Sequence, residues 1–136
     1  MLDAALNFSS DNFIQDPMAY LTELYMAGKM EQLQAEAERM VKDPAYRFFD
    51  FEKEFNDTGY RLMNRNQMEP ALHVFQLNAQ LFPESANAWD SLAEANWRSG
   101  NTDKAIEYYN KAIGMDPDGS VGENARAMLK RVKEGR

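Results

Sequence analysis

The sequence lacks cysteine and holds a single histidine, His73, among its 136 residues. Without cysteine there is neither a disulfide framework nor a thiol nucleophile, which is the usual composition of a protein in a reducing compartment. We therefore expect a cytoplasmic protein. A periplasmic location is the alternative if the chain is part of a longer secreted protein.

Basic residues and long apolar runs are also scarce. The chain has 15 lysines and arginines against 22 carboxylates, for a formal net charge of −7. Binding to a phosphate backbone needs clustered basic residues, and a membrane span needs about 20 consecutive apolar residues. The first ten residues lack the charged start and apolar stretch of a secretion signal. The sequence thus predicts neither a nucleic-acid nor a membrane partner.

Motifs for catalysis and metal binding are missing as well. There is no Gly-x-Ser-x-Gly turn, no glycine-rich phosphate loop and no His-Glu-x-x-His. Carboxylate pairs such as Asp116 and Asp118 lack the spaced loop of a calcium site. His73 lies two residues from both Ala71 and Phe75, which predicts a solvent-facing position. We expect no enzyme activity of this chain by itself, no catalytic residue, no cofactor and no metal.

What the sequence does contain is a repeat with a period of 34 residues. Phe55, Gly59, Ala71, Phe75, Leu81 and Pro83 recur in kind as Trp89, Ala93, Ala105, Tyr109, Met115 and Pro117. Apolar residues in each copy follow helical spacing, and Asn66 or Gly100 stands where a left-handed residue would end the first helix. This pattern is typical of stacked helix–turn–helix units, so the predicted fold class is all-α.

Helical spacing extends beyond the two copies. It predicts a degenerate helix pair over 16–43, repeats over 52–83 and 86–117, and a capping helix over 120–133. Ser120 and Glu123 have the spacing of a capping box at the start of that last helix. Residues 1–15 are expected to form an arm or a short helix. No low-complexity linker interrupts the chain, which predicts a single domain over 1–136.

Residues 52–117 resemble tetratricopeptide repeats. One copy carries the resemblance through Trp89, Leu92, Ala93, Ala105, Tyr109, Ala112 and Pro117, and the other through Phe55, Gly59, Ala71, Phe75 and Pro83. The resemblance implies a right-handed superhelix of antiparallel helix pairs, in which the first helix of each pair lines a concave groove. Thr58, Asn78 and Asn96 depart from the family pattern.

Positions on the first helices that face away from the packed residues define the predicted groove. They are Lys53, Asn56, Tyr60, Asn64, Asn87, Asp90, Glu94, Trp97 and Arg98. Packing against a neighbouring helix is the favoured interpretation for Met63 and an equal alternative for Trp97. Because Asp90 and Glu94 oppose Lys53 and Arg98, the groove is unsuited to clamping a peptide carboxylate. It favours a partner segment with basic and apolar residues.

Two interpretations of function follow. The first is a non-catalytic module that binds a protein or peptide in its groove. The second depends on another resemblance: Asn78, Phe82, Asn87 and Asp90-Ser91-Leu92 are similar to a repeat segment that follows the catalytic domain in some bacterial serine hydrolases. That resemblance implies the tail of a larger enzyme, acting in packing against its own N-terminal domain or in oligomerisation. The sequence leaves the oligomeric state open.

Overall fold

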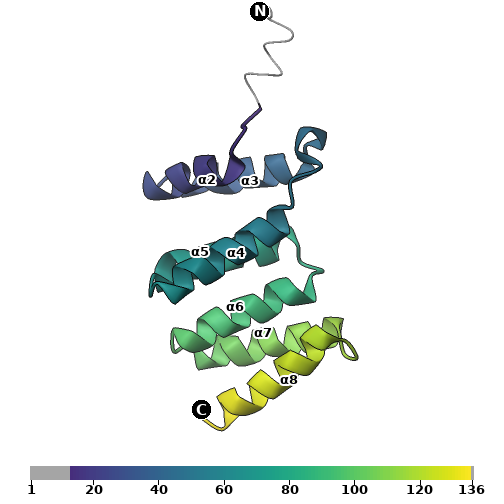
Figure 1. Cartoon of the computed structure of the whole chain (residues 1–136). Helices are drawn as coiled ribbons and strands as arrows, with labels where there is room; N and C mark the ends of the chain where they lie inside the picture. Colours follow the sequence, from purple (N-terminus) through teal and green to yellow (C-terminus); the bar gives the residue numbers. More distant parts are fainter. Residues whose placement is uncertain (1–12, 136) are drawn as a thin grey trace, which may run out of the picture. The chain divides into compact units, whose positions relative to one another are not determined.

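The computed structural model describes residues 13–135. Within this range the regular structure is entirely helical, with seven α-helices and one short 3₁₀ turn, so the all-α prediction is confirmed (Figure 1). Most of the arm predicted over 1–15 lies outside the described residues. The chain divides into two compact units, Met1–Asp50 and Phe51–Arg136, and the single-domain interpretation stays a prediction.

The first unit contains one helix pair. Helix α2 spans Pro17–Met26, α3 spans Met30–Lys42, and the 3₁₀ turn η1 spans Pro44–Tyr46. Asp16 caps α2 by accepting a hydrogen bond from the Ala19 N–H at 3.2 Å. The helix ends at Met26, and Gly28 then adopts a left-handed φ of 74° that turns the chain. The buried apolar residues of this unit are Leu21, Leu24, Leu33, Ala37, Met40 and Tyr46.

The second unit contains both full repeats and the terminal helix. Its helices are α4 (Phe51–Asn64), α5 (Met68–Leu81), α6 (Ala86–Arg98), α7 (Thr102–Met115) and α8 (Ser120–Lys133). The predicted boundaries agree to within a residue or two. Asn66 and Gly100 occupy equivalent turns with φ of 61° and 86°, as expected for residues that end a helix in the left-handed conformation.

The core of the second unit lies in two successive layers. Phe75 anchors the first layer and Tyr109, its equivalent one repeat later, anchors the second. The other buried members of the first layer are Met63, Ala71, Ala79, Ala88, Leu92 and Ala95; those of the second are Ala93, Ala105, Ala112, Ala125, Leu129 and Val132. Small residues let the helix backbones approach, and one fully buried aromatic side chain lies in each layer, with partly buried aromatic side chains packed around it.

Helix α8 closes the second layer with one apolar face and exposes charged side chains such as Arg126 and Lys130. The capping box expected at its start is wrong. Ser120 is the first residue inside the helix, and Gly119 in the N-cap position has no side chain to offer. Asp116 from the preceding turn caps the helix instead, because its Oδ2 accepts from the Val121 and Gly122 N–H groups at 3.1 and 3.3 Å.

Candidate functional site

The first helices of successive repeats lie beside one another in the second unit, since α4 contacts α6 and α6 contacts α8. Side chains that are equivalent in the repeat therefore meet. The Tyr60 hydroxyl donates to Glu94 Oε1 at 2.8 Å, and these residues stand 34 positions apart. The Ser91 hydroxyl donates to Asn56 Oδ1 at 2.7 Å. We call the surface formed by the predicted groove residues on α4 and α6, with the facing residues of α8, the groove face.

The same pattern continues from α6 to α8. Asn124 Nδ2 lies 3.5 and 3.4 Å from the two carboxylate oxygens of Asp90, again across 34 positions. The guanidinium of Arg131 lies over the ring of Trp97, 5.3 Å from its centroid. The sequence-based groove omitted Asn124 and Arg131. The repeat period would have found them, because they follow Asp90 and Trp97 by one period.

The predicted groove residues differ in exposure. Lys53, Asn64, Asn87 and Arg98 are exposed, while Asn56, Tyr60, Glu94 and Trp97 are half-buried. Asp90 is only 8% exposed, so its expected place on an open surface is wrong: α8 brings Asn124 against it. Met63 is fully buried, which confirms the packing interpretation for that residue.

The predicted cations of the groove have acidic neighbours on their own helices. Lys53 Nζ lies 2.7 Å from Asp57 Oδ2, and Arg98 lies 3.7 Å from Glu94 Oε2. Both pairs join residues four positions apart on an exposed helix face, where such pairs contribute little to stability. They nevertheless reduce the positive potential that would attract a peptide carboxylate.

Burial shapes the electrostatics around Asp90. It raises the pKa of the Asp90 carboxyl to about 6, with the Asn124 hydrogen bond lowering that pKa and the nearby Glu94 charge raising it. The pKa of the Tyr109 hydroxyl is raised by burial, then by the charges of Asp90 and Glu94. Among the described residues, that hydroxyl has no hydrogen-bond partner, although Tyr109 is only 1% exposed. Burial also raises the pKa of Tyr60.

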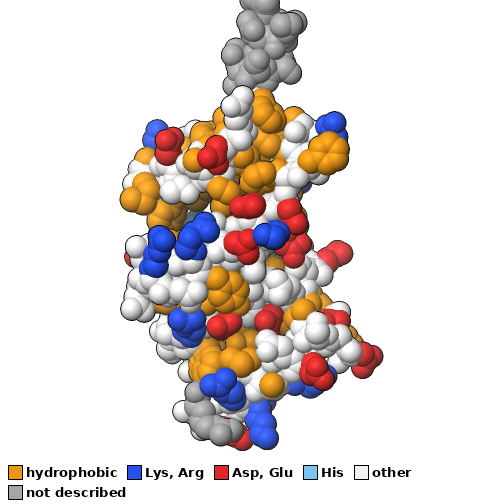
Figure 2. All heavy atoms as spheres, in the orientation of Figure 1, with side chains coloured by type: hydrophobic (Ala, Val, Ile, Leu, Met, Phe, Trp, Pro, Cys, Tyr) orange, Lys and Arg blue, Asp and Glu red, His pale blue; other side chains and the backbone are white. Residues whose placement is uncertain are grey.

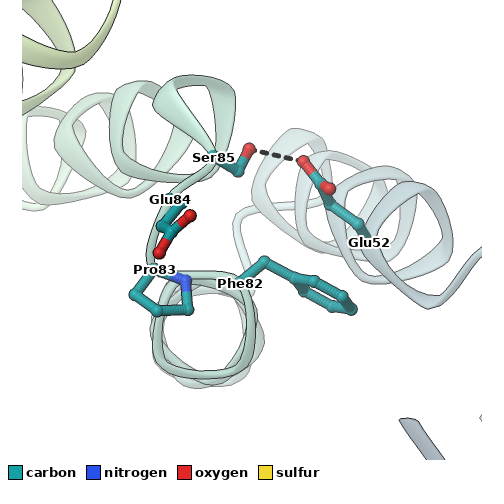
Figure 3. A pocket seen from close by; sticks show the side chains of 5 residues that line it. All are labelled: Glu52, Phe82, Pro83, Glu84 and Ser85. Atoms are coloured by element: carbon teal, nitrogen blue, oxygen red, sulfur yellow. Dashed lines mark hydrogen bonds between the residues drawn. The ribbon is translucent and has the colours of Figure 1, made fainter. Parts of the chain in front are cut away.

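A separate hollow of about 380 Å³ lies at the start of α4 and the turn between α5 and α6 (Figure 3). The Ser85 hydroxyl donates to Glu52 Oε2 and accepts from the Ala88 N–H, which makes it the N-cap of α6. Phe82, Pro83 and Glu84 complete the lining. Among the described residues that line this hollow there is no histidine. The hydrogen bond between Ser85 and Glu52 joins the start of α6 to α4 of the preceding repeat.

Other candidate sites receive no support within residues 13–135. There is no cluster of three or more histidine, aspartate or glutamate side chains that could hold a metal ion. None of the helices in this range has the length and apolarity needed to cross a membrane. His73 is half-buried and not solvent-facing as predicted, and burial lowers its pKa.

Comparison with known proteins agrees with this architecture. Residues 86–118 match the tetratricopeptide repeat family model. Superkiller protein 3 of Schizosaccharomyces pombe is 34% identical over 70 residues, which cover 48% of this chain and 5% of that protein. The chain therefore spans a small part of that relative.

Two crystal structures share the fold at 20% sequence identity. PcrH from Pseudomonas aeruginosa superposes with a TM-score of 0.58, covering 86% of this chain and 89% of PcrH. PcrH in complex with the chaperone binding region of PopD superposes with a TM-score of 0.57, covering 88% of this chain and 90% of that one. The fold is that of a tetratricopeptide-like helical repeat protein.

Proposed function

We propose that the second unit is a non-catalytic module that binds a peptide, or an extended segment of a partner protein, on its groove face. The observation that carries this proposal is the mixture of side chains on α4, α6 and α8. Partly exposed tyrosine and tryptophan rings stand beside amides and carboxylates there, and such rings are enriched at binding surfaces. Figure 2 shows acidic side chains over α6, with hydrophobic surface on neighbouring parts of the same unit.

The shared fold supports the same proposal. PcrH was crystallised with a segment of another protein, the chaperone binding region of PopD. Helical arrays of this kind are formed before a ligand arrives, so the groove face should bind with little backbone movement. A peptide or protein segment is therefore the partner class that we assign to this chain.

The charge pattern of the chain indicates which peptide composition it would bind. The whole chain carries a net charge of −7, and Lys53 and Arg98 already face acidic neighbours. A segment with basic and apolar residues complements this surface better than one that offers a terminal carboxylate. The absence of cysteine supports a cytoplasmic location for the encounter.

The test is selection of binding peptides from a random display library on the full chain, followed by a chemical-shift titration with the selected peptide. We expect the perturbed amides to cluster on α4, α6 and α8. Trp97→Ala should weaken binding, whereas Lys104→Ala, an exposed change on α7, should leave it unchanged. Perturbations around His73 and Lys104, or over 45–51, would overturn the proposal.

The alternative role as the tail of a serine hydrolase finds no support among the matched proteins. Its test is independent of binding. A reading frame that continues upstream into several hundred residues with a catalytic serine would establish it, and the groove face would then be examined for contacts with that domain.

A further inference from the structure

One position of the repeat carries a charge in only one of its three occurrences. Asn56, Asp90 and Asn124 are spaced by one period on α4, α6 and α8, and only the middle residue carries a carboxylate. Asp90 is 8% exposed, and its contacts with Asn124 are 3.4 and 3.5 Å long, beyond the usual N–H···O range. An asparagine would fit the same space without burying a charge. The carboxylate therefore makes the fold less stable than an amide would.

Two further acceptor groups lie close to this carboxylate. Glu94 is one turn further along α6, accepts from Tyr60, and has its nearest cation, Arg98, at 3.7 Å. The hydroxyl of Tyr109 comes from α7, is buried, and has no hydrogen-bond partner among residues 13–135. Tyr109 packs in the same core layer as Ala93, the residue that precedes Glu94 on α6, and the charges of Asp90 and Glu94 raise the pKa of its hydroxyl.

Aromatic side chains border this group of acceptors. Tyr60 is tied to Glu94 by its hydroxyl and packs edge-on against Phe75, with ring centroids 5.2 Å apart. Trp97 lies two turns after Asp90 on the same face of α6, and it already accepts one cation, Arg131, over its ring. A guanidinium group is thus held in this neighbourhood by the chain itself.

We propose that Asp90, Glu94 and Tyr109 form a subsite for the guanidinium or ammonium group of an arginine or lysine side chain in the bound segment. This inference rests on the proposed function and specifies the chemistry of the partner. The carboxylates would accept charge-assisted hydrogen bonds, the Tyr109 hydroxyl oxygen would accept another, and the rings of Tyr60 and Trp97 would flank the alkyl stem. A cation also neutralises the charge that Asp90 buries, which explains why a destabilising carboxylate is useful at this position.

The affinity of this subsite for a cation should depend on pH. The titratable groups coupled to Asp90 are Tyr60 on α4, Glu94 on α6 and Tyr109 on α7. Two cations act on these neighbours: Arg98 lies 3.7 Å from Glu94, and the charge of Arg131 on α8 acts on Tyr109. Tyrosines and arginines keep their charge state between pH 5 and 8. Affinity for a cation should therefore fall as Asp90 takes up a proton below pH 6, and an Asp90→Asn variant should show no such fall in this range.

The test uses the full chain and two acetylated, amidated peptides, Ala-Leu-Arg-Leu-Ala and the same peptide with citrulline in place of arginine. Citrulline keeps the shape and removes the charge. At pH 8 we expect the arginine peptide to bind about fivefold more tightly than the citrulline peptide. That ratio corresponds to the upper range of the free energy measured for a partly exposed ion pair. Shifts should centre on Glu94 and the Trp97 indole. Spermidine, a free polyamine, should bind more weakly than the arginine peptide if the cation belongs to a peptide.

Two variants separate recognition from folding. Asp90→Asn should lower affinity for the arginine peptide to the citrulline level while raising the melting temperature at pH 8 by roughly 4 °C or more. Tyr109→Phe should weaken binding of the arginine peptide without lowering the melting temperature, because the hydroxyl that it removes has no partner.

Each outcome decides the matter. Equal binding of both peptides on the groove face overturns the cation subsite and leaves the proposed function intact. Failure of the arginine peptide to bind, or tighter binding of spermidine, overturns the subsite as well. Chemical-shift changes confined to the helix faces around His73 and Lys104 overturn both the cation subsite and the proposed function. A lower melting temperature of Asp90→Asn would show that the carboxylate is structural, and would overturn the inference.

Discussion

The ring of Phe75 lies where a side chain on Gly59 would have to be. A Cβ built on Gly59 would come within 2.4 Å of Phe75 Cε1, far inside normal contact. Gly59 belongs to α4 and Phe75 to α5, so the glycine sets how closely the two helices of the first full repeat can cross. The ring then fills the first layer of the core.

Gly59→Ala should therefore destabilise the protein by about 1–3 kcal/mol through overpacking. Gly114→Ala is the matched control, since a Cβ there would meet nothing within 4 Å and the position lies inside α7. That change should stabilise the helix by about 0.5–1 kcal/mol. Urea unfolding of both variants checks the pair. If Gly114→Ala proved more destabilising than Gly59→Ala, the close crossing of α4 and α5 at Gly59 would be wrong.

Deleting residues 119–136 should uncover the second core layer. Leu129 and Val132 pack there from α8, so we expect a loss of about 3–6 kcal/mol, the worth of two buried aliphatic side chains. The exposed apolar layer should also cause association, measurable by light scattering. Lys130→Ala, on the exposed face of α8, serves as the control and should change stability by less than about 0.5 kcal/mol. A truncated chain with unchanged melting would contradict the capping role.

Asp116→Ala should destabilise the protein by about 1 kcal/mol, because it removes the side chain that accepts from the first N–H groups of α8. Ser120→Ala should have almost no effect, since Ser120 makes no capping hydrogen bond. Thermal unfolding of the two single variants compares them directly. A larger loss for Ser120→Ala would restore the capping box that the sequence suggested.

Stability should also depend on pH through Asp90. The pKa of its carboxyl rises from 3.8 to about 6 on folding, so between these values the folded chain holds a proton that the unfolded chain has lost. The contribution of Asp90 to stability is therefore greatest below pH 4 and declines until pH 6 is passed. The stability advantage of Asp90→Asn should grow by about 1–3 kcal/mol between pH 4 and pH 8. Denaturant titrations across this range measure it, and a constant difference would contradict the buried carboxylate.

Much of the fold could be predicted because its determinants are local. The period of 34 residues, the helical spacing of the apolar residues and the turn residues Asn66 and Gly100 placed the helices of both repeats to within a residue or two. Met63 was correctly assigned to the core by the same spacing. The groove residues could be named only as positions on a helix face, which spacing determines without reference to what lies opposite.

The sequence by itself determined a helical repeat with small residues at the crossings and an aromatic side chain in each layer, because backbone preference and apolar periodicity act over a few residues. Only the tertiary structure decided that Asp90 is buried, that Arg131 covers Trp97 and that Asp116 caps α8. These outcomes depend on where α8 packs and how side chains from different helices share one space. Burial, and with it the pKa of a carboxyl, is a property of that shared space.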